Sequence, residues 1–373
     1  MKCSPLLVLV TSLALAHVPG ASAEVGDWAV VPATNGEMPA FMERVVADVT
    51  RELERYGRHV WHSHAAAVRF QEQGSSAAVG IAKDALEKWD QHSRAAIRAL
   101  TRGDHATAFS RLDQAERLSR SATEDINRSP ERALRVLDTC LYKVRALLET
   151  DEAASAAAHA SECVVLVPNV EPATLMHPPR VLALYQRARE QGRARAATLV
   201  VESAPPGCIV RVNGVRFGET PLKITTLSVG EYGVQVECDG TGRGRIHSTK
   251  VGPGTTKQVV DDRFDRTVRT EPILRLEYPR ERRNGWRAND ARDIAELLPA
   301  HTIVIVSALT ADTVAVGLVT QTGSRQGCSL IPATAEGPSR EALAVAIRRL
   351  IEGKCGDVSV SRRDTAALFN PGI

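Results

Sequence analysis

The spacing of apolar residues changes several times along the chain, and each change marks a segment with a different expected structure. In the segment 24–75, two short apolar runs alternate with two stretches of helical spacing, which predicts a β-α-β-α order. In the segment 271–355, the pattern predicts a strand, a helix, an almost wholly apolar strand at 302–308, two more strands and an amphipathic helix. A strand that is apolar on both faces is typical of the centre of a sheet covered by helices. Residues 356–373 lack periodicity and are expected to form a flexible tail.

The two end segments are expected to form one α/β domain, because each is too small to bury an adequate core by itself. Together they supply about five strands, which is a normal sheet. In the order of its elements, this combination resembles the small α/β domain at the N-terminus of the periplasmic Tol-Pal propeller protein. Similar domains occur in curli-secretion and flagellar outer-membrane accessory proteins. The alternative is two separate small domains, and contact between residues 28–31 and 302–308 distinguishes the two hypotheses.

The segment 76–195 is rich in alanine and leucine and shows helical spacing. It predicts two helical hairpins, at 81–118 and 130–165, and a third helix at 179–191 that caps them. The hairpins resemble tetratricopeptide repeats, with small residues at the helix crossing, a Gly-Asp or Thr-Asp turn, and proline just past the second helix. Their turns are 47 residues apart, whereas a regular tetratricopeptide array repeats about every 34 residues. An irregular helical bundle without a groove is therefore the alternative.

The segment 197–262 changes to β-branched alternation, and Asn213-Gly214 is a strong signal for a tight hairpin turn. Within it, the run 203–240 resembles a PEGA domain. The matching features are a Pro-x-Gly turn followed by Cys208, where the family usually has alanine, the Val-Asn-Gly hairpin, a Gly-x-Thr-Pro-Leu turn and a Gly-x-Tyr-x-Val-x-Val strand. The resemblance implies a small antiparallel β-sandwich of the kind found in bacterial surface and envelope proteins. It also implies a binding or spacer role and supplies no catalytic residues.

The N-terminus has the order of a secretory signal peptide over residues 1–23. Lys2 provides a positive start, residues 6–16 form an apolar run too short to span a bilayer, and small residues precede the expected cleavage after Ala23. Glu24 stands where a lipoprotein needs a cysteine, so lipid anchoring is not expected. No later stretch approaches the roughly 20 apolar residues that cross a membrane. The protein is therefore expected to be exported to the periplasm or cell surface, without an integral membrane segment.

Six cysteines remain after Cys3 is removed with the signal peptide, and an even number in an exported chain indicates disulfides. They fall into three sequential pairs, so the simplest pairing is local: Cys140–Cys163, Cys208–Cys238 and Cys328–Cys355. Zinc binding is the alternative, but no CxxC or CxxH spacing occurs. Metal ligation and catalytic use of a thiol are therefore not expected.

Charge and composition argue against one class of partner. The formal net charge is +3 and aromatic residues make up 4% of the chain, without a basic stripe carrying stacking aromatics. Binding of nucleic acid is therefore not expected. No Gly-x-Ser-x-Gly, His-Glu-x-x-His or partnered Ser-x-x-Lys motif is present, so no catalytic residue and no cofactor is expected.

Three weaker features are expected to be structural. His62 and His64 would share a strand face next to Trp61, with His59 before it, as a candidate copper or zinc pair, but no third ligand is fixed nearby and an exposed strand end is expected. The glycine- and arginine-rich run 240–245 lies between β-segments and predicts a mobile hairpin; the alternative is contact with an anionic glycan. Acidic pairs amid arginines are expected to be solvated pairs and helix charge complements rather than a glycosidase dyad: Asp261-Asp262 and Asp290/Asp293.

These expectations combine into a multidomain α+β protein, with helical hairpins, a small β-sandwich and an α/β domain assembled from both ends of the chain. The expected function is that of an exported, non-catalytic envelope protein that mediates protein–protein or cell-surface interactions. Its partner would be an envelope protein or a cell-surface glycan. A carbohydrate- or peptidoglycan-binding protein that acts through the PEGA-like face is the first alternative, and a hydrolase with an unrecognised site is the second.

Overall fold

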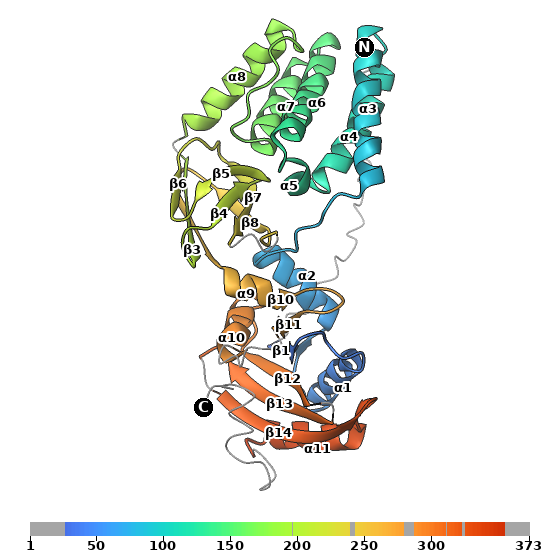
Figure 1. Ribbon diagram of the computed structural model, residues 1–373, viewed down its shortest axis with the longest axis vertical. Helices are drawn as coiled ribbons and strands as arrows, with labels where there is room; N and C mark the ends of the chain where they lie inside the picture. The colour runs from blue at the N-terminus through green and yellow to red at the C-terminus, as the bar shows by residue number, and fades with distance from the viewer. Residues whose placement is uncertain are drawn as a thin grey trace, which may run out of the picture.

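The computed structural model describes residues 27–195, 197–238, 243–279, 287–310, 312–322 and 325–354, with only the backbone described for 325–329. Three parts follow one another along its long axis (Figure 1). An α/β domain with the first and last elements lies at one end, a β-sandwich lies in the middle, and a helical region lies at the other end. The expected signal peptide and the expected tail fall outside the described residues. Among the helices that are described, none is long and apolar enough to cross a membrane.

The two ends of the chain share one sheet. Strand β1 (Trp28–Asn35) pairs in parallel with β12 (Thr302–Thr310), so that Trp28 lies opposite Thr302 and Val31 opposite Ile305. The sheet has eight strands in the order β10-β11-β1-β12-β13-β14-β15, with β2 also paired to β1. Its remaining strands are β2 (Val60–Trp61), β10 (Val268–Arg269), β11 (Arg275–Tyr278), β13 (Thr313–Thr320), β14 (Arg325–Thr334) and β15 (Gly337–Pro338). The pairing that distinguishes one composite domain from two separate domains is therefore present.

Helices cover both faces of this sheet, which explains why β12 is apolar along its length. Ile303 and Ile305 pack with one core beneath α2 (Ser63–Gln73) and α10 (Arg287–Leu297). Val304 and Val306 point the other way, into a second core beneath α1 (Met42–Arg55) and α11 (Arg340–Ile351). Because side chains alternate along the strand, one continuous apolar run contributes residues to both hydrophobic cores.

The helical region consists of two antiparallel hairpins and a covering helix. The first hairpin joins α3 (Lys83–Thr101) to α4 (His105–Arg120), and the second joins α6 (Pro130–Glu149) to α7 (Ala153–Leu166). Asp104 and Ser129 cap the N-termini of α4 and α6 with their side chains. A short helix, α5 (Thr123–Ile126), connects the hairpins, and α8 (Pro179–Arg193) packs on α7. The hairpins were predicted from the helical spacing, whereas α5 was not.

The middle part is a sandwich of two small sheets over a common core. One sheet has the order β6-β3-β9, and the other has the order β5-β4-β7-β8. The second sheet is antiparallel throughout, while β3 and β9 pair in parallel. The strands are β3 (Ala197–Ala204), β4 (Ile209–Val212), β5 (Val215–Glu219), β6 (Leu222–Ile224), β7 (Gly230–Glu237), β8 (His247–Val251) and β9 (Gly254–Asp261). Helix α9 (Asp262–Thr267) then leads back to the α/β domain.

Candidate functional site at the junction of the sandwich and the helices

The Asn213-Gly214 turn between β4 and β5 is also the point where the sandwich docks on the helical region. Both residues have positive φ (48° and 83°), as a tight hairpin turn requires. The Asn213 side chain donates to the carbonyl of Val165 at 2.7 Å and accepts from the amide of Gly233 at 2.7 Å. The Asn127 side chain donates to the Asn213 carbonyl at 3.0 Å. One residue of the turn therefore ties together the end of α7, the end of α5 and strand β7.

An ion cluster closes the same junction a short distance away. Arg128, just after α5, donates to both carboxylate oxygens of Glu237 on β7, at 2.5 and 3.0 Å. Arg211 on β4 donates to the same carboxylate at 3.0 Å. Burial would raise the pKa of the Glu237 carboxyl, but hydrogen bonds and charge from the two arginines outweigh it and lower the pKa below its ordinary value of 4.5. The junction is therefore held partly by a carboxylate that must stay ionised.

Glu237→Gln is expected to lower the free energy of unfolding by about 2 kcal/mol at neutral pH, because hydrogen bonds to charged groups are among the stronger ones. A lowered pKa in the folded state means that this stabilisation is present above the ordinary pKa and is lost as pH falls through the folded value. Unfolding in urea, measured at a series of pH values below neutral, should therefore show a weaker loss of stability in acid for the variant than for the wild type.

Glu219→Gln is the matched control for this prediction. Glu219 pairs with Arg216 in the same sandwich at 3.1 Å, but both side chains are more than half exposed. Its loss should cost less than about 0.5 kcal/mol. Equal effects of the two substitutions would show that the junction does not depend on the Glu237 charge.

Beside this contact, the helices and the sandwich enclose a cleft of about 590 Å³. Helices α4, α5 and α7 form one wall, and strands β7 and β8 form the other. Its apolar lining residues are Val165, Leu166, Val229 and Ile246. Its charged lining residues are Arg120, Glu124, Glu162 and Glu231. The cleft thus combines an apolar surface with an excess of carboxylates.

Glu124 is the carboxylate that is set deepest in the contact between the two parts. A Cβ on Gly233 would lie 2.4 Å from the Glu124 Oε1, so the absence of a side chain at 233 makes room for this carboxylate. Burial raises the pKa of the Glu124 carboxyl. Within the described part of the chain no cation lies within ion-pair distance of it, whereas Glu162 is paired with Arg120 at 2.9 Å. A half-buried carboxylate without a cation is a favourable position for the amino or guanidinium group of a ligand.

The structure places the candidate histidines differently from the sequence-based expectation. Strand β2 ends at Trp61, His62 is the N-cap residue of α2, and His64 lies within that helix. The shared strand face expected for His62 and His64 is therefore wrong. His62 instead lies 3.9 Å from Glu54, with both side chains substantially exposed.

The expectation of solvated acidic pairs is also wrong for two of the four residues. Asp290 is fully buried and Asp262 nearly so, in contacts with arginines. Asp261 and Asp293 agree with the prediction, because their side chains are substantially exposed beside Arg263 and Arg292. Asp261 also caps α9 by accepting from the amide of Phe264. Asp290, through Arg263, connects α9 to the α/β domain.

The arginine-rich run 240–245 lies partly outside the described residues, but its last residue is well defined. Arg245 is buried and donates to the side-chain and main-chain oxygens of Ser75 and to the carbonyl of Val268. Arg243 pairs with Asp125 at 2.8 Å. Arg243 is exposed in this ion pair, whereas Arg245 is buried, so the expectation of a mobile loop is wrong for Arg245.

Two of the three expected cysteine pairs are bonded in the structure. The Cys140–Cys163 disulfide joins α6 to α7, with Cα atoms 5.8 Å apart. The Cys208–Cys238 disulfide joins residues next to the paired ends of β4 and β7, with Cα atoms 4.4 Å apart. The third expected pair, Cys328–Cys355, involves side chains outside the described part of the structure.

The residues that form the junction were not identified from the sequence. Asn213 was recognised as a turn residue, but its role in docking depends on the carbonyl of a helix 48 positions away. Glu124 lies in a helix of only four residues, which is too short to show periodicity. No local signal could have found either role.

Comparison with known proteins agrees with the architecture of the middle part. The family model of the PEGA domain matches residues 196–241. This match covers β3 to β7 and ends before β8 and β9, which complete the two sheets. No curated protein and no solved structure matches the chain. The sandwich that docks on the helical hairpins therefore contains a PEGA domain.

Proposed function

We propose that this protein is an exported, non-catalytic interaction protein that binds a segment of a partner protein in the cleft between its helices and its PEGA domain. The observation that carries the proposal is Glu124, a half-buried carboxylate that lines the cleft. Among the described residues, no cation lies within ion-pair distance of it. A partner segment with one basic side chain and flanking apolar side chains would complement this lining. The tetratricopeptide-like hairpins supply one wall of the site, so both parts contribute to binding.

A protein segment fits the cleft better than a glycan does. The one aromatic residue among the lining residues, Tyr232, is buried and donates its hydroxyl to the carbonyl of Ser228. The cleft therefore offers no exposed aromatic face for a sugar ring. Its apolar residues would stay uncovered beneath a polar saccharide, whereas leucine or valine side chains of a peptide would cover them.

Two further observations support the non-catalytic and exported parts of the proposal. The lining residues include no histidine, lysine or cysteine, but the hydroxyl of Ser248 donates to the carboxylate of Glu231. Activation of a hydroxyl usually needs a base that a third group orients, and this exposed pair has no such third group among the described residues. The two disulfides suit an oxidising compartment.

The test is site-specific photocrosslinking in cells that produce the full chain, with p-benzoylphenylalanine at Ser161 or Ser248. Both positions line the cleft and are exposed. We expect crosslinked adducts whose partner is digested by protease. Glu124→Gln should reduce the yield of these adducts at least about tenfold, because a charged hydrogen bond to the partner is lost. The matched control is p-benzoylphenylalanine at Lys257, an exposed position on the other sheet of the sandwich.

Adducts that resist protease but yield to a muramidase would replace the proposal with the glycan-binding alternative. Adducts equally strong from position 257, or unchanged by Glu124→Gln, would show that the cleft is not the binding site.

A further inference from the structure

Three side chains that can bind a soft divalent cation meet between α6 and α7. Cys140 comes from α6, while His159 and Cys163 are four residues apart on α7 and so share one face of that helix. Their ligand atoms lie within 4.8 Å of one another, and all three residues are buried. The His159 Nε2 is 3.6 Å from the Cys140 Sγ. The His-x-x-x-Cys spacing is present in the sequence, although it is not one of the two spacings considered for zinc above.

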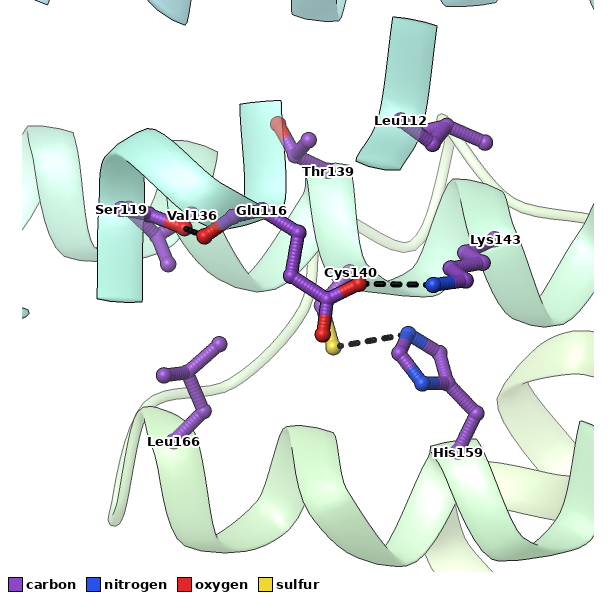
Figure 2. Close-up of a pocket in the computed structure, with 9 residues that line it drawn as sticks. All are labelled: Leu112, Glu116, Ser119, Val136, Thr139, Cys140, Lys143, His159 and Leu166. Carbon is purple, nitrogen blue, oxygen red and sulfur yellow. Dashed lines mark hydrogen bonds and ion pairs between the residues drawn. The ribbon is translucent and has the colours of Figure 1, made fainter. Parts of the chain in front are cut away.

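A carboxylate from a third helix faces the same point. Glu116 of α4 directs its side chain toward Cys140 and His159 (Figure 2). With His159 and Glu162 it forms a second group whose ligand atoms lie within 4.8 Å of one another. A cavity of about 20 Å³ lies among Glu116, Cys140 and His159, which is space for one water or one ion. Glu116 is the better fourth ligand because it is far less exposed than Glu162.

The two cations next to this point each have a second carboxylate partner. His159 is buried beside them, and its neutral ring is the form that binds a metal ion. Lys143 is bound to both Asp113 and Glu116, at 2.8 and 2.7 Å. Arg120 also donates two hydrogen bonds to Glu116, at 2.8 and 2.6 Å. If Glu116 turned to a metal ion, Lys143 would keep Asp113 as its partner and Arg120 would keep Glu162.

We propose that reduction of the Cys140–Cys163 disulfide converts this cluster into a zinc site with Cys140, Cys163, His159 and Glu116 as ligands. A dithiol reductant supplies two electrons and two protons, the S–S bond breaks, two thiols form, and the reductant becomes a disulfide. Binding of Zn²⁺ then displaces the two thiol protons. The disulfide and the metal site exclude each other, because both use the same two sulfur atoms.

The required movement is small. The ligand atoms of a tetrahedral zinc ion are separated by roughly 3.3–3.8 Å, given the usual bond lengths to sulfur and nitrogen. The two sulfur atoms, bonded at 2.03 Å, must move apart. The histidine already lies near both sulfur atoms, and the Glu116 carboxylate lies near the histidine. The α6–α7 hairpin stays crosslinked in either state.

The test uses the full mature chain, reduced without oxygen by tris(2-carboxyethyl)phosphine. Cobalt(II) serves as the spectroscopic probe, and a chromophoric chelator measures the zinc affinity in competition. We expect one metal ion that binds only after reduction and shows cobalt–thiolate charge-transfer absorption. Cys140→Ser with Cys163→Ser should abolish this ion, which separates it from metal held by the other cysteines.

His159→Ala should weaken zinc binding by at least about 100-fold, since it removes a direct ligand and not merely an outer partner. His105→Ala is the control, because His105 lies in the same helical region but pairs with Glu149. Glu116→Gln, with circular dichroism to confirm folding, provides a second variant if His159→Ala does not fold. It should weaken binding at least about tenfold, because a neutral amide replaces an anionic ligand. The proposal is wrong if the reduced wild type binds no metal at these cysteines, or if neither His159→Ala nor Glu116→Gln changes the affinity.

Discussion

Asp290→Asn is expected to lower the free energy of unfolding by about 3–5 kcal/mol, the usual cost of removing one member of a buried ion pair. Asp290 is fully buried at the start of α10. Its carboxylate accepts from two nitrogen atoms of Arg263, at 2.9 and 2.8 Å, and from the hydroxyl of Tyr278 at 2.8 Å. Asparagine would place an NH₂ group where one of the carboxylate oxygens now accepts a hydrogen bond from Arg263 or Tyr278. It would also remove the negative charge that pairs with the Arg263 guanidinium.

The substitution should also loosen the connection between the PEGA domain and the α/β domain. Arg263 lies in α9, directly after the last strand of the sandwich, whereas Tyr278 ends β11 of the large sheet. Asp290 thus binds the segment that leaves the sandwich to the sheet and helix of the α/β domain. Amide hydrogen exchange in 262–267 should therefore rise in the variant along with the loss of stability.

Asp293→Asn is the matched control on the same helix. Burial raises the pKa of the Asp293 carboxyl, so the charged form of this residue contributes little to stability. Its replacement should change the unfolding free energy by less than about 0.5 kcal/mol. Urea unfolding followed by tryptophan fluorescence compares the two variants. A loss for Asp290→Asn no larger than that for Asp293→Asn would mean that the buried pair does not stabilise the fold.

The sequence predicts those parts of the fold that depend on local pattern. The apolar run of β12, the alternation around the Asn213-Gly214 turn and the helical spacing of α6 and α7 each reflect burial on particular faces of one element. The disulfides within the helical region and the sandwich were predictable because each joins neighbouring elements of one hairpin or sheet. In each of these cases the pattern of one element, or of neighbouring elements, carries the signal, even where the partner of β12 lies at the other end of the chain.

The rest depends on contacts between distant segments. Asp290 is buried because Arg263 and Tyr278 come from other elements, and nothing around Asp290 in the sequence distinguishes it from Asp293. His64 was assigned to a strand because β2 has only two residues, so the boundary between strand and helix could not be placed. Candidate site residues such as Glu124 acquire their environment only when the sandwich docks on the helices. Local pattern carries no information on that docking.

Gly214→Ala is expected to disrupt this docking, at a cost of about 2–5 kcal/mol. Positive φ alone costs an alanine about 1–2 kcal/mol. A Cβ at this position would in addition lie 2.2 Å from the backbone oxygen of Glu124, so α5 and the turn would have to separate. Overpacking of that kind adds about 1–3 kcal/mol. Backbone atoms cannot rotate away as a flexible side chain could, which is why the effect should be large.

Gly207→Ala is the control that measures the cost of positive φ alone. Gly207 also has positive φ (85°) in the same domain, but nothing lies within 4 Å of its Cβ position. The difference between the two variants in urea unfolding therefore measures the docking contact itself. Hydrogen exchange at Thr123–Ile126 should increase in Gly214→Ala only. Since Asn213 and Gly233 line the cleft beside this contact, crosslinking from Ser161 should fall in the same variant. If both alanine variants lose equal stability and leave α5 equally protected, the turn does not hold the PEGA domain against the helices, and the cleft cannot depend on it.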